Sequence, residues 1–327
     1  MKAKYFKYNL AFKRPSGTSR GVLTEKETWF IVLEVNGRKG IGECGILRGL
    51  SADDRLDYEE KLQWTCNNIH LGVEMAFLSL KSENPFVLFP SKFTSGEKSI
   101  SINGLVWMGD EVFMKQQIEE KIAQGFNCIK LKIGAIDFDK ELQLLRFIRD
   151  NFDENKIEIR VDANGAFDEN EALNKINQLS GYKLHSIEQP IQKKHTDTMS
   201  VLCKSTNLPI ALDEELIGIF SYNEKEALLK KVRPQYIILK PSFIGGIKGT
   251  NEWITLAEKY NIGWWITSAL ESNIGLNAIS QFTFMLNTTM PQGLGTGSLY
   301  TNNFDCPLLV ENGQLWYKPE LDWKVDF

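Results

Sequence analysis

The sequence contains few histidines and few cysteines, and its cysteines lie far apart. There are 3 His and 5 Cys among 327 residues, and no two cysteines form a Cys-x-x-Cys pair. Structural zinc sites and disulfide frameworks need clustered ligands, so both are disfavoured. The first residues also lack the long apolar core of a signal peptide. Scattered thiols without a secretion signal are typical of a reducing compartment, and we expect a cytoplasmic protein.

Long hydrophobic runs and an excess of basic charge are also missing. Apolar segments such as 237–239 and 262–266 fall far short of the roughly 18 residues that a membrane-spanning helix needs. Lys plus Arg number 38 against 42 Asp plus Glu, which gives a net charge of -4. We therefore expect neither a membrane nor nucleic acid as a partner. The oligomeric state stays open.

The first ninety or so residues show strands followed by helices, without alternation. Strand-like sequence on both sides of Asn36-Gly37 predicts a β-hairpin, because Asn-Gly accepts the positive φ angles of a tight turn. Helix-like patterns follow over about 52–68 and 71–82, and we interpret the polar segment 12–28 as a mobile loop. This order of elements favours a small α+β module.

From about residue 98, short apolar strands alternate with amphipathic helices. Candidate strand ends recur at intervals of 25 to 30 residues, near Gly104, Lys132, Asp162, Glu188, Asp213, Lys240, Ser268 and Gly295. Eight such units favour a closed barrel over an open, doubly wound sheet. The predicted fold class is α/β: a (β/α)8-type, modified TIM barrel with an α+β capping domain.

The end of the sequence becomes β-like again. Residues 308–318 contain a second hairpin pattern around Asn312-Gly313. We expect this tail to return to the N-terminal module. The predicted domains are therefore a cap of residues 1–95, completed by about 306–327, and a barrel of residues 96–305.

Five consecutive predicted strands end in a charged residue, in the order Lys132, Asp162, Glu188, Asp213 and Lys240. Barrel enzymes place their catalytic residues at these ends of the strands. A structural salt bridge is an equally good explanation for any single one of these residues. Five in consecutive units instead favour an active site.

The three carboxylates would repel each other unless a cation lay between them. An oxygen-only, histidine-free set of ligands suits a hard ion, so Asp162, Glu188 and Asp213 predict a Mg²⁺ site, with Mn²⁺ as a substitute. Lys132 and Lys240 come from strands four apart and should face each other across the barrel. Neighbouring positive charges lower a lysine pKa, which allows one amine to act as a base toward a proton on the α-carbon of a carboxylate.

This combination resembles the enolase superfamily, in particular its muconate-lactonizing-enzyme-like subgroup. The motifs that carry the resemblance are Lys130-x-Lys132, Asp162-x-Asn164, Glu188-Gln189-Pro190, Asp213-Glu214 and Lys240-Pro241. It implies that Lys132 and Lys240 are the acid/base lysines and that the three carboxylates hold Mg²⁺. Mandelate-racemase-like members carry a catalytic histidine on the seventh strand, and the histidines here, at 70, 185 and 195, lie elsewhere.

Within the subgroup, the segments 268–275 and 293–303 are most similar to the family of o-succinylbenzoate synthases. Segment 293–298 lacks the Asp-x-Asp that dipeptide epimerases use to hold an ammonium group. The resemblance implies a small carboxylate substrate from which Lys132 removes the α-proton, while Lys240 stays protonated. Two alternatives stay open: an N-acylamino acid racemase or another muconate-lactonizing-like enzyme, and a catalytically inactive barrel that only binds ligands.

Further residues are candidates for contacts with the substrate or with the catalytic groups. They are Lys130, Asn164, Glu214, Ser268, Glu271, Gly295, Thr296 and Arg20. Glu214 and Glu271 could orient Lys240 or serve packing equally well. Arg20 lies in a candidate lid segment and would suit a dianionic substrate, although an ordinary solvated loop is an equal alternative.

Overall fold

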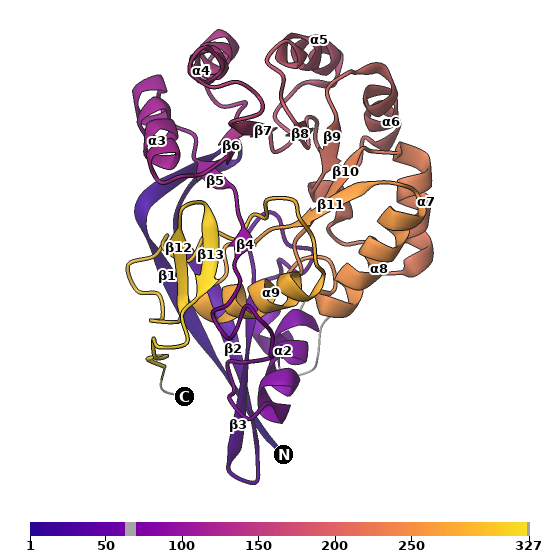
Figure 1. The fold of residues 1–327 in the computed structure, drawn as a ribbon. Helices are drawn as coiled ribbons and strands as arrows, with labels where there is room; N and C mark the ends of the chain where they lie inside the picture. The colour runs from indigo at the N-terminus through magenta and orange to yellow at the C-terminus, as the bar shows by residue number, and fades with distance from the viewer. Residues whose placement is uncertain (63–69, 326–327) are drawn as a thin grey trace.

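A computed structural model of the chain describes residues 1–62 and 70–325, and Figure 1 shows a curled parallel sheet flanked by an antiparallel cap. The N-terminal sheet has the order β1-β2-β3. The elements of this part are β1 Lys2–Thr18, β2 Gly21–Val35, β3 Arg38–Gly45, α1 Tyr58–Leu62 and α2 His70–Lys81. The hairpin at Asn36-Gly37 and the helix predicted over 71–82 are confirmed. The helix predicted over 52–68 is observed over α1, and its last part lies outside the described residues.

The interpretation of 12–28 as a loop is wrong. β1 and β2 form one long hairpin in which Thr18 pairs with Gly21, so only Ser19 and Arg20 connect the strands. The pairing is irregular between Ala11 and Ser16. The segment is polar because much of the hairpin is exposed, and its pairing partners come from the other strand rather than from the local sequence.

The central sheet has seven strands in the order β11-β10-β9-β8-β7-β6-β5, all parallel, with helices on its outer side (Figure 1). Its strands are β5 Gly104–Val106, β6 Cys128–Lys132, β7 Glu158–Asp162, β8 Ser186–Glu188, β9 Ile210–Leu212, β10 Tyr236–Leu239 and β11 Gly263–Ile266. The helices are α3 Glu111–Ala123, α4 Phe138–Asn151, α5 Glu169–Ser180, α6 Thr196–Ser205, η1 Glu214–Leu216, α7 Tyr222–Val232, α8 Gly246–Lys259 and α9 Asn273–Met285.

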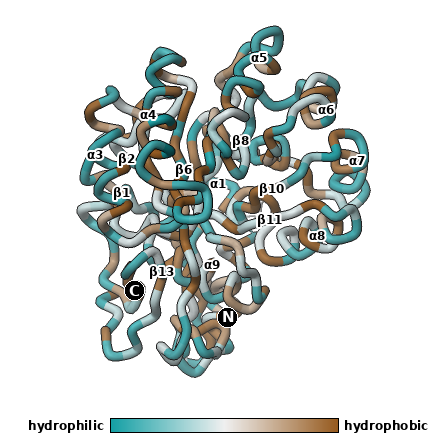
Figure 2. Tube along the Cα trace, turned by 45° about the horizontal axis from the view of Figure 1, so that its top comes forward, coloured by the Kyte–Doolittle hydropathy of each residue, from teal (hydrophilic) through white to brown (hydrophobic). Residues whose placement is uncertain are grey.

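Local sequence explains most of these elements. Five helices begin with a capping residue whose side chain accepts a hydrogen bond from a backbone N–H group of the first turn. These residues are Asp110, Asp137, Asp168, Ser221 and Ser272. The outer helices bury an apolar stripe and expose a polar one, and Figure 2 shows the alternating hydropathy along them. The buried stripes pack on strands whose side chains are almost entirely buried, which forms the main core.

The barrel differs from eight full strands at its eighth position. Gln292 forms a parallel bridge with Ile102, and Gly293 forms one with Thr267, so two residues close the gap between the first and last strands. The segment after them, Gly293–Gly297, is rich in glycine, which has a low strand propensity and supports only this short pairing. The predicted class, an α/β barrel with an α+β cap, is nevertheless confirmed.

The C-terminal hairpin consists of β12 Leu308–Glu311 and β13 Gln314–Tyr317, as the Asn-Gly pattern predicts. β13 pairs with β4, Ile100–Ser101, which leads into the barrel. Residues just before the hairpin contact the cap: Thr301 donates its backbone N–H to Ala11 O at 2.9 Å. The tail itself contacts the predicted cap through Trp323, whose ring stacks on Phe86, and the domain boundaries remain a prediction.

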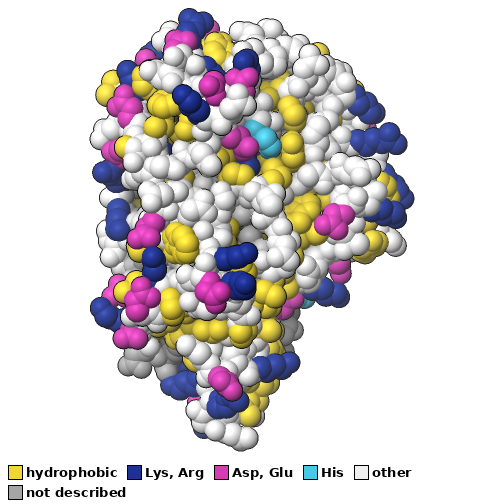
Figure 3. Space-filling view, in the orientation of Figure 1, with side chains coloured by type: hydrophobic (Ala, Val, Ile, Leu, Met, Phe, Trp, Pro, Cys, Tyr) yellow, Lys and Arg dark blue, Asp and Glu magenta, His cyan; other side chains and the backbone are white. Residues whose placement is uncertain are grey.

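The surface carries charges of both signs. On the face that Figure 3 shows, Lys and Arg side chains are interspersed with Asp and Glu side chains. Within residues 1–62 and 70–325, no helix combines the length and the apolar character that crossing a bilayer requires. Cys44, Cys128, Cys203 and Cys306 are free thiols.

Candidate active site

Three adjacent strands place three of the predicted site residues side by side. Lys132 on β6 is in register with Asp162 on β7, which is in register with Glu188 on β8. The alternation of side chains along β6 puts Lys130 on the same inward side as Lys132. All four side chains are buried, which makes this end of the barrel a dense cluster of charges.

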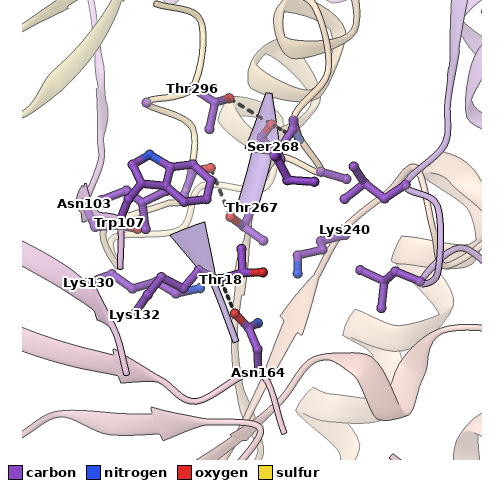
Figure 4. A pocket seen from close by; sticks show the side chains of 18 of the residues that line it. Thr18, Asn103, Trp107, Lys130, Lys132, Asn164, Lys240, Thr267, Ser268 and Thr296 are labelled. Carbon is purple, nitrogen blue, oxygen red and sulfur yellow. Dashed lines mark hydrogen bonds between the residues drawn. The ribbon is translucent and has the colours of Figure 1, made fainter. Parts of the chain in front are cut away.

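The following strands complete a ring around the barrel mouth. Asp213 and Glu214 directly follow β9, and Lys240 directly follows β10. In Figure 4, Lys130 and Lys132 enter the pocket from one side and Lys240 enters from the opposite side. The five strand-end residues are therefore brought together, as the barrel geometry predicts.

Close ion pairs connect the lysines with the carboxylates. Lys130 Nζ lies 2.9 Å from Asp162 Oδ2 and also contacts Glu188. Lys132 Nζ lies 2.5 Å from Asp162 Oδ2 and 2.7 Å from Asn164 Oδ1. Lys240 pairs with Asp213. Each carboxylate is thus held by at least one ammonium group.

The two opposing lysines have different electrostatic surroundings. Burial, with the positive charges of Lys130 and Lys240, lowers the pKa of Lys132 against the attraction of Asp162. Burial also disfavours the charged form of Lys240, but Asp213, Glu188 and Glu214 outweigh it and raise the pKa of that amine.

The carboxylates are suited to a positive ion. Burial and the negative charges of Asp162 and Asp213 raise the pKa of Glu188 well above its usual value. Glu188 Oε1 is buried and has no hydrogen-bond partner among the described residues. An oxygen donor set that includes an unpartnered, buried carboxylate oxygen fits a hard divalent cation.

In the described part of the chain, no group of three or more His, Cys, Asp or Glu side chains is arranged to hold a metal. The ammonium groups of Lys130 and Lys132 lie against the carboxylates instead. The metal ligands therefore remain a prediction that the donor chemistry supports.

The hairpin between β1 and β2 reaches the barrel mouth from the cap. Arg20 Nη1 lies 2.7 Å from Glu214 Oε1, and Ser19 Oγ donates to Asn164 O at 3.3 Å. Asn164 Nδ2 donates to the same Glu214 oxygen at 3.1 Å. Burial and neighbouring Asp213 raise the pKa of Glu214. Arg20, Glu214 and Asn164 thus form one connected contact between cap and barrel.

Another wall of the pocket is formed by the residues that follow β11 and by those that follow the short eighth pairing at Gln292 and Gly293. Ser268, Gly295 and Thr296 line the pocket, and Thr296 Oγ1 donates to Ser268 Oγ at 2.9 Å. Ser268 Oγ in turn donates to Glu271 Oε2 at 2.7 Å. Glu271 therefore lies behind the wall and supports it.

Sequence reasoning missed several residues of the pocket. Thr18, Asn103, Trp107 and Thr267 also line it (Figure 4). Asn103 is buried, and its Oδ1 atom has no hydrogen-bond partner within the described ranges. Its place one residue before Gly104, a predicted strand end, was a signal that could have identified it.

Comparison with known proteins agrees with this arrangement. The family described as "Enolase C-terminal domain-like" matches residues 114–319. The chain belongs to this family, and so to the enolase superfamily, within the subgroup of the muconate lactonizing enzymes. It is 46% identical to the o-succinylbenzoate synthase of Desulfotalea psychrophila, over 96% of this chain and 98% of that protein.

Solved structures extend the likeness to the whole fold. The crystal structure of MenC from Desulfotalea psychrophila has a TM-score of 0.85, with 42% identity over 97% of this chain and 99% of that one. Muconate lactonizing enzyme from Pseudomonas fluorescens has a TM-score of 0.82 and 21% identity, over 99% and 96%. A dipeptide epimerase from Cytophaga hutchinsonii, complexed with Mg and a dipeptide, has a TM-score of 0.81 and 18% identity, over 99% and 96%. The last two show the fold alone.

Proposed function

We propose that the chain is an o-succinylbenzoate synthase, a hydro-lyase of menaquinone biosynthesis. It would remove water from a hydroxycyclohexadiene carboxylate that bears a succinyl group, and so form an aromatic ring. The full-length identity to the Desulfotalea psychrophila enzyme carries this proposal. The two lysines on opposite sides of the pocket support it. The free thiols fit a cytoplasmic location.

Lys132 is the proposed base. Its Nζ is held by Asp162 Oδ2 and Asn164 Oδ1, which fix the amine at the inner end of the pocket. The neutral amine takes the proton from the carbon next to the substrate carboxylate. The resulting ammonium returns this proton to the hydroxyl group on the neighbouring carbon, which leaves as water. One C–H and one C–O bond break, and a ring double bond forms.

Lys240 is the proposed stabilising cation. It stands opposite Lys132 and pairs with Asp213, so it stays charged while the substrate carries its extra negative charge. An ammonium group that is already in place stabilises such an anion without reorganisation.

Asp162, Glu188 and Asp213 would hold Mg²⁺, or Mn²⁺ as a substitute. When bound, the ion supplies positive charge that stabilises the substrate carboxylate as its α-proton is lost. The carboxylates contribute the oxygen donors, and Lys130, paired with Asp162 and Glu188, keeps two of them in place.

The proposal is tested with purified protein, Mg²⁺ and the cyclohexadiene substrate. We expect an absorbance change as the product becomes aromatic, and we expect Lys132→Ala to lower kcat by at least about 100-fold. Circular dichroism checks that the variant keeps its fold. Absence of turnover by the wild-type protein, together with racemisation of N-succinyl amino acids, would show that the chain is a racemase instead.

A further inference from the structure

A second group of charged side chains is buried where the cap meets the barrel, outside the pocket. It consists of Lys26 on β2, Glu43 on β3 and Glu271 after β11, which are 3%, 1% and 0% exposed. Charged side chains are rarely buried to this extent unless they have partners. The partners of each residue therefore indicate what the group does.

Glu43 joins the cap to the start of α9. Its carboxylate accepts hydrogen bonds from Ser272 N, Gly275 N and Thr28 Oγ1, each at 2.9 Å. Backbone N–H groups at a helix N-terminus are otherwise without partners and attract negative charge. A carboxylate from the cap thus accepts the hydrogen bonds of backbone N–H groups at the start of a barrel helix.

Glu271 connects two loops of the catalytic end. Its carboxylate accepts hydrogen bonds from Ser268 Oγ at 2.7 Å and from Ala269 N at 2.8 Å, and it also accepts one from Ser242 Oγ. Ser242 lies two residues after Lys240, and Ser268 forms the pocket wall. The position of Glu271 therefore affects both the Lys240 loop and the wall.

Lys26 is the cation of this group: burial lowers the pKa of its amine, and the charges of the nearby Glu43 and Glu271 oppose this effect. A Cβ atom added to Gly45 would lie 3.2 Å from Lys26 Nζ and 4.0 Å from Glu271 Cγ, so the amine and the Glu271 side chain both face this glycine. Lys26 Nζ has no hydrogen-bond acceptor among the described residues. Its interaction with the two acids is therefore one of charge, acting at low dielectric.

We propose that Lys26 is a positioning residue for the catalytic end of the barrel, because its charge holds Glu271, and through Glu271 the Ser268 wall and the Lys240 loop, in place. The cap would then contribute to catalysis through Lys26 near Glu271 as well as through Arg20 at the mouth of the pocket. Without Lys26, two carboxylates would remain buried together with no cation beside them. Their repulsion would displace Glu271 and its hydrogen-bond donors.

The test compares Lys26→Met with a matched control, Lys225→Met. Lys225 is also buried, at 1% exposure, but it lies on α7 and pairs with Glu252 at 2.8 Å, outside the pocket. The kinetic part of the test rests on the proposed function. We expect Lys26→Met to lower kcat/KM about 10- to 100-fold, as small displacements near reacting groups do. We expect Lys225→Met to leave kcat/KM within about 2-fold where both variants are folded.

Glu271→Gln completes a double-mutant cycle. Gln keeps the size of the side chain but removes the charge that Lys26 faces, so adding Lys26→Met to it should lower kcat/KM by less than about 3-fold. Multiplicative losses in the double variant would overturn the proposal. Equal losses for Lys26→Met and Lys225→Met would do the same, because they would reflect general destabilisation.

Hydrogen exchange gives a readout that needs no substrate. The Ala269 amide is bonded to Glu271, so peptides covering 268–272 should exchange faster in Lys26→Met and unchanged in Lys225→Met. If the wild-type protein does not turn over the substrate, the proposed function fails, and this exchange comparison still decides the role of Lys26. Unchanged exchange of 268–272 in Lys26→Met would refute it.

Discussion

Replacing Arg20 by Met should weaken the closure of the cap over the pocket. Arg20 lines both the inner cavity, of about 90 Å³, and an outer cavity of about 560 Å³. The inner cavity is much smaller than the roughly 300 Å³ at which ligand-binding pockets begin, so we expect the hairpin tip to move when a substrate enters. We therefore expect the Arg20–Glu214 contact to break when the substrate enters and to re-form over it.

The magnitude follows from the geometry of this contact. A hydrogen bond of 2.7 Å between charged groups is worth about 1.5–3 kcal/mol when it is buried. The Arg20 side chain is 40% exposed while that of Glu214 is 5% exposed, so solvent screens part of this energy. We take ~1–2 kcal/mol, which corresponds to a loss in kcat/KM of about 5- to 30-fold.

The assay is steady-state kinetics of Arg20→Met beside Arg14→Met, an exposed arginine of the same hairpin. We expect the loss only for Arg20→Met, mainly through a higher KM, and we expect added salt to reduce the difference. In a Glu214→Gln background, Arg20→Met should have less than about 3-fold effect. Equal kinetics for the two arginine variants, or fully multiplicative effects with Glu214→Gln, would refute the closure argument.

Three further predictions concern buried charges of the barrel domain. Lys240→Met should lower kcat at least about 100-fold without unfolding, as seen by turnover assay and circular dichroism. Chelation with EDTA should abolish turnover, and Mg²⁺ should raise the Tm of the wild-type protein but not of Glu188→Gln, as measured by scanning calorimetry. Burial raises the pKa of Glu141 from 4.5 to about 7. The folded state therefore binds more protons than the unfolded state between these values, and the free energy of unfolding should fall by up to ~3 kcal/mol as pH rises through this range. Urea titrations should show a flatter dependence for Glu141→Gln.

The catalytic end of the barrel was predictable because its signals are local. Side chains alternate between the inside and the outside of the barrel along each strand. Five residues of sequence are therefore enough to assign Lys130 and Lys132 of β6, and Asp162 at the end of β7, to the interior. The regular spacing of the units then places consecutive strand ends side by side. The observed register of Lys132, Asp162 and Glu188 agrees with this reasoning.

The parts that were not predictable depend on partners distant in sequence. The hairpin of β1 and β2 has a polar sequence, and its pairing of residues 9–11 with residues 25–27 has no signature within either segment. The eighth position is held by Gln292 and Gly293 only, through bridges to residues at 102 and 267. Glycine-rich sequence gives no periodic pattern that would mark so short a pairing.

The hairpin also explains how the cap can influence both ends of the pocket. Arg20 at its tip contacts Glu214, whereas Lys26, six residues further along β2, lies near Glu271 behind the Ser268 wall. Six residues of strand span about 20 Å. The strand connects the two contacts. We therefore expect movement of the hairpin tip during substrate entry to shift Lys26 as well. Arg20→Met is therefore expected to raise the hydrogen exchange of the segment 268–272, although Arg20 and Glu271 lie on different sides of the pocket.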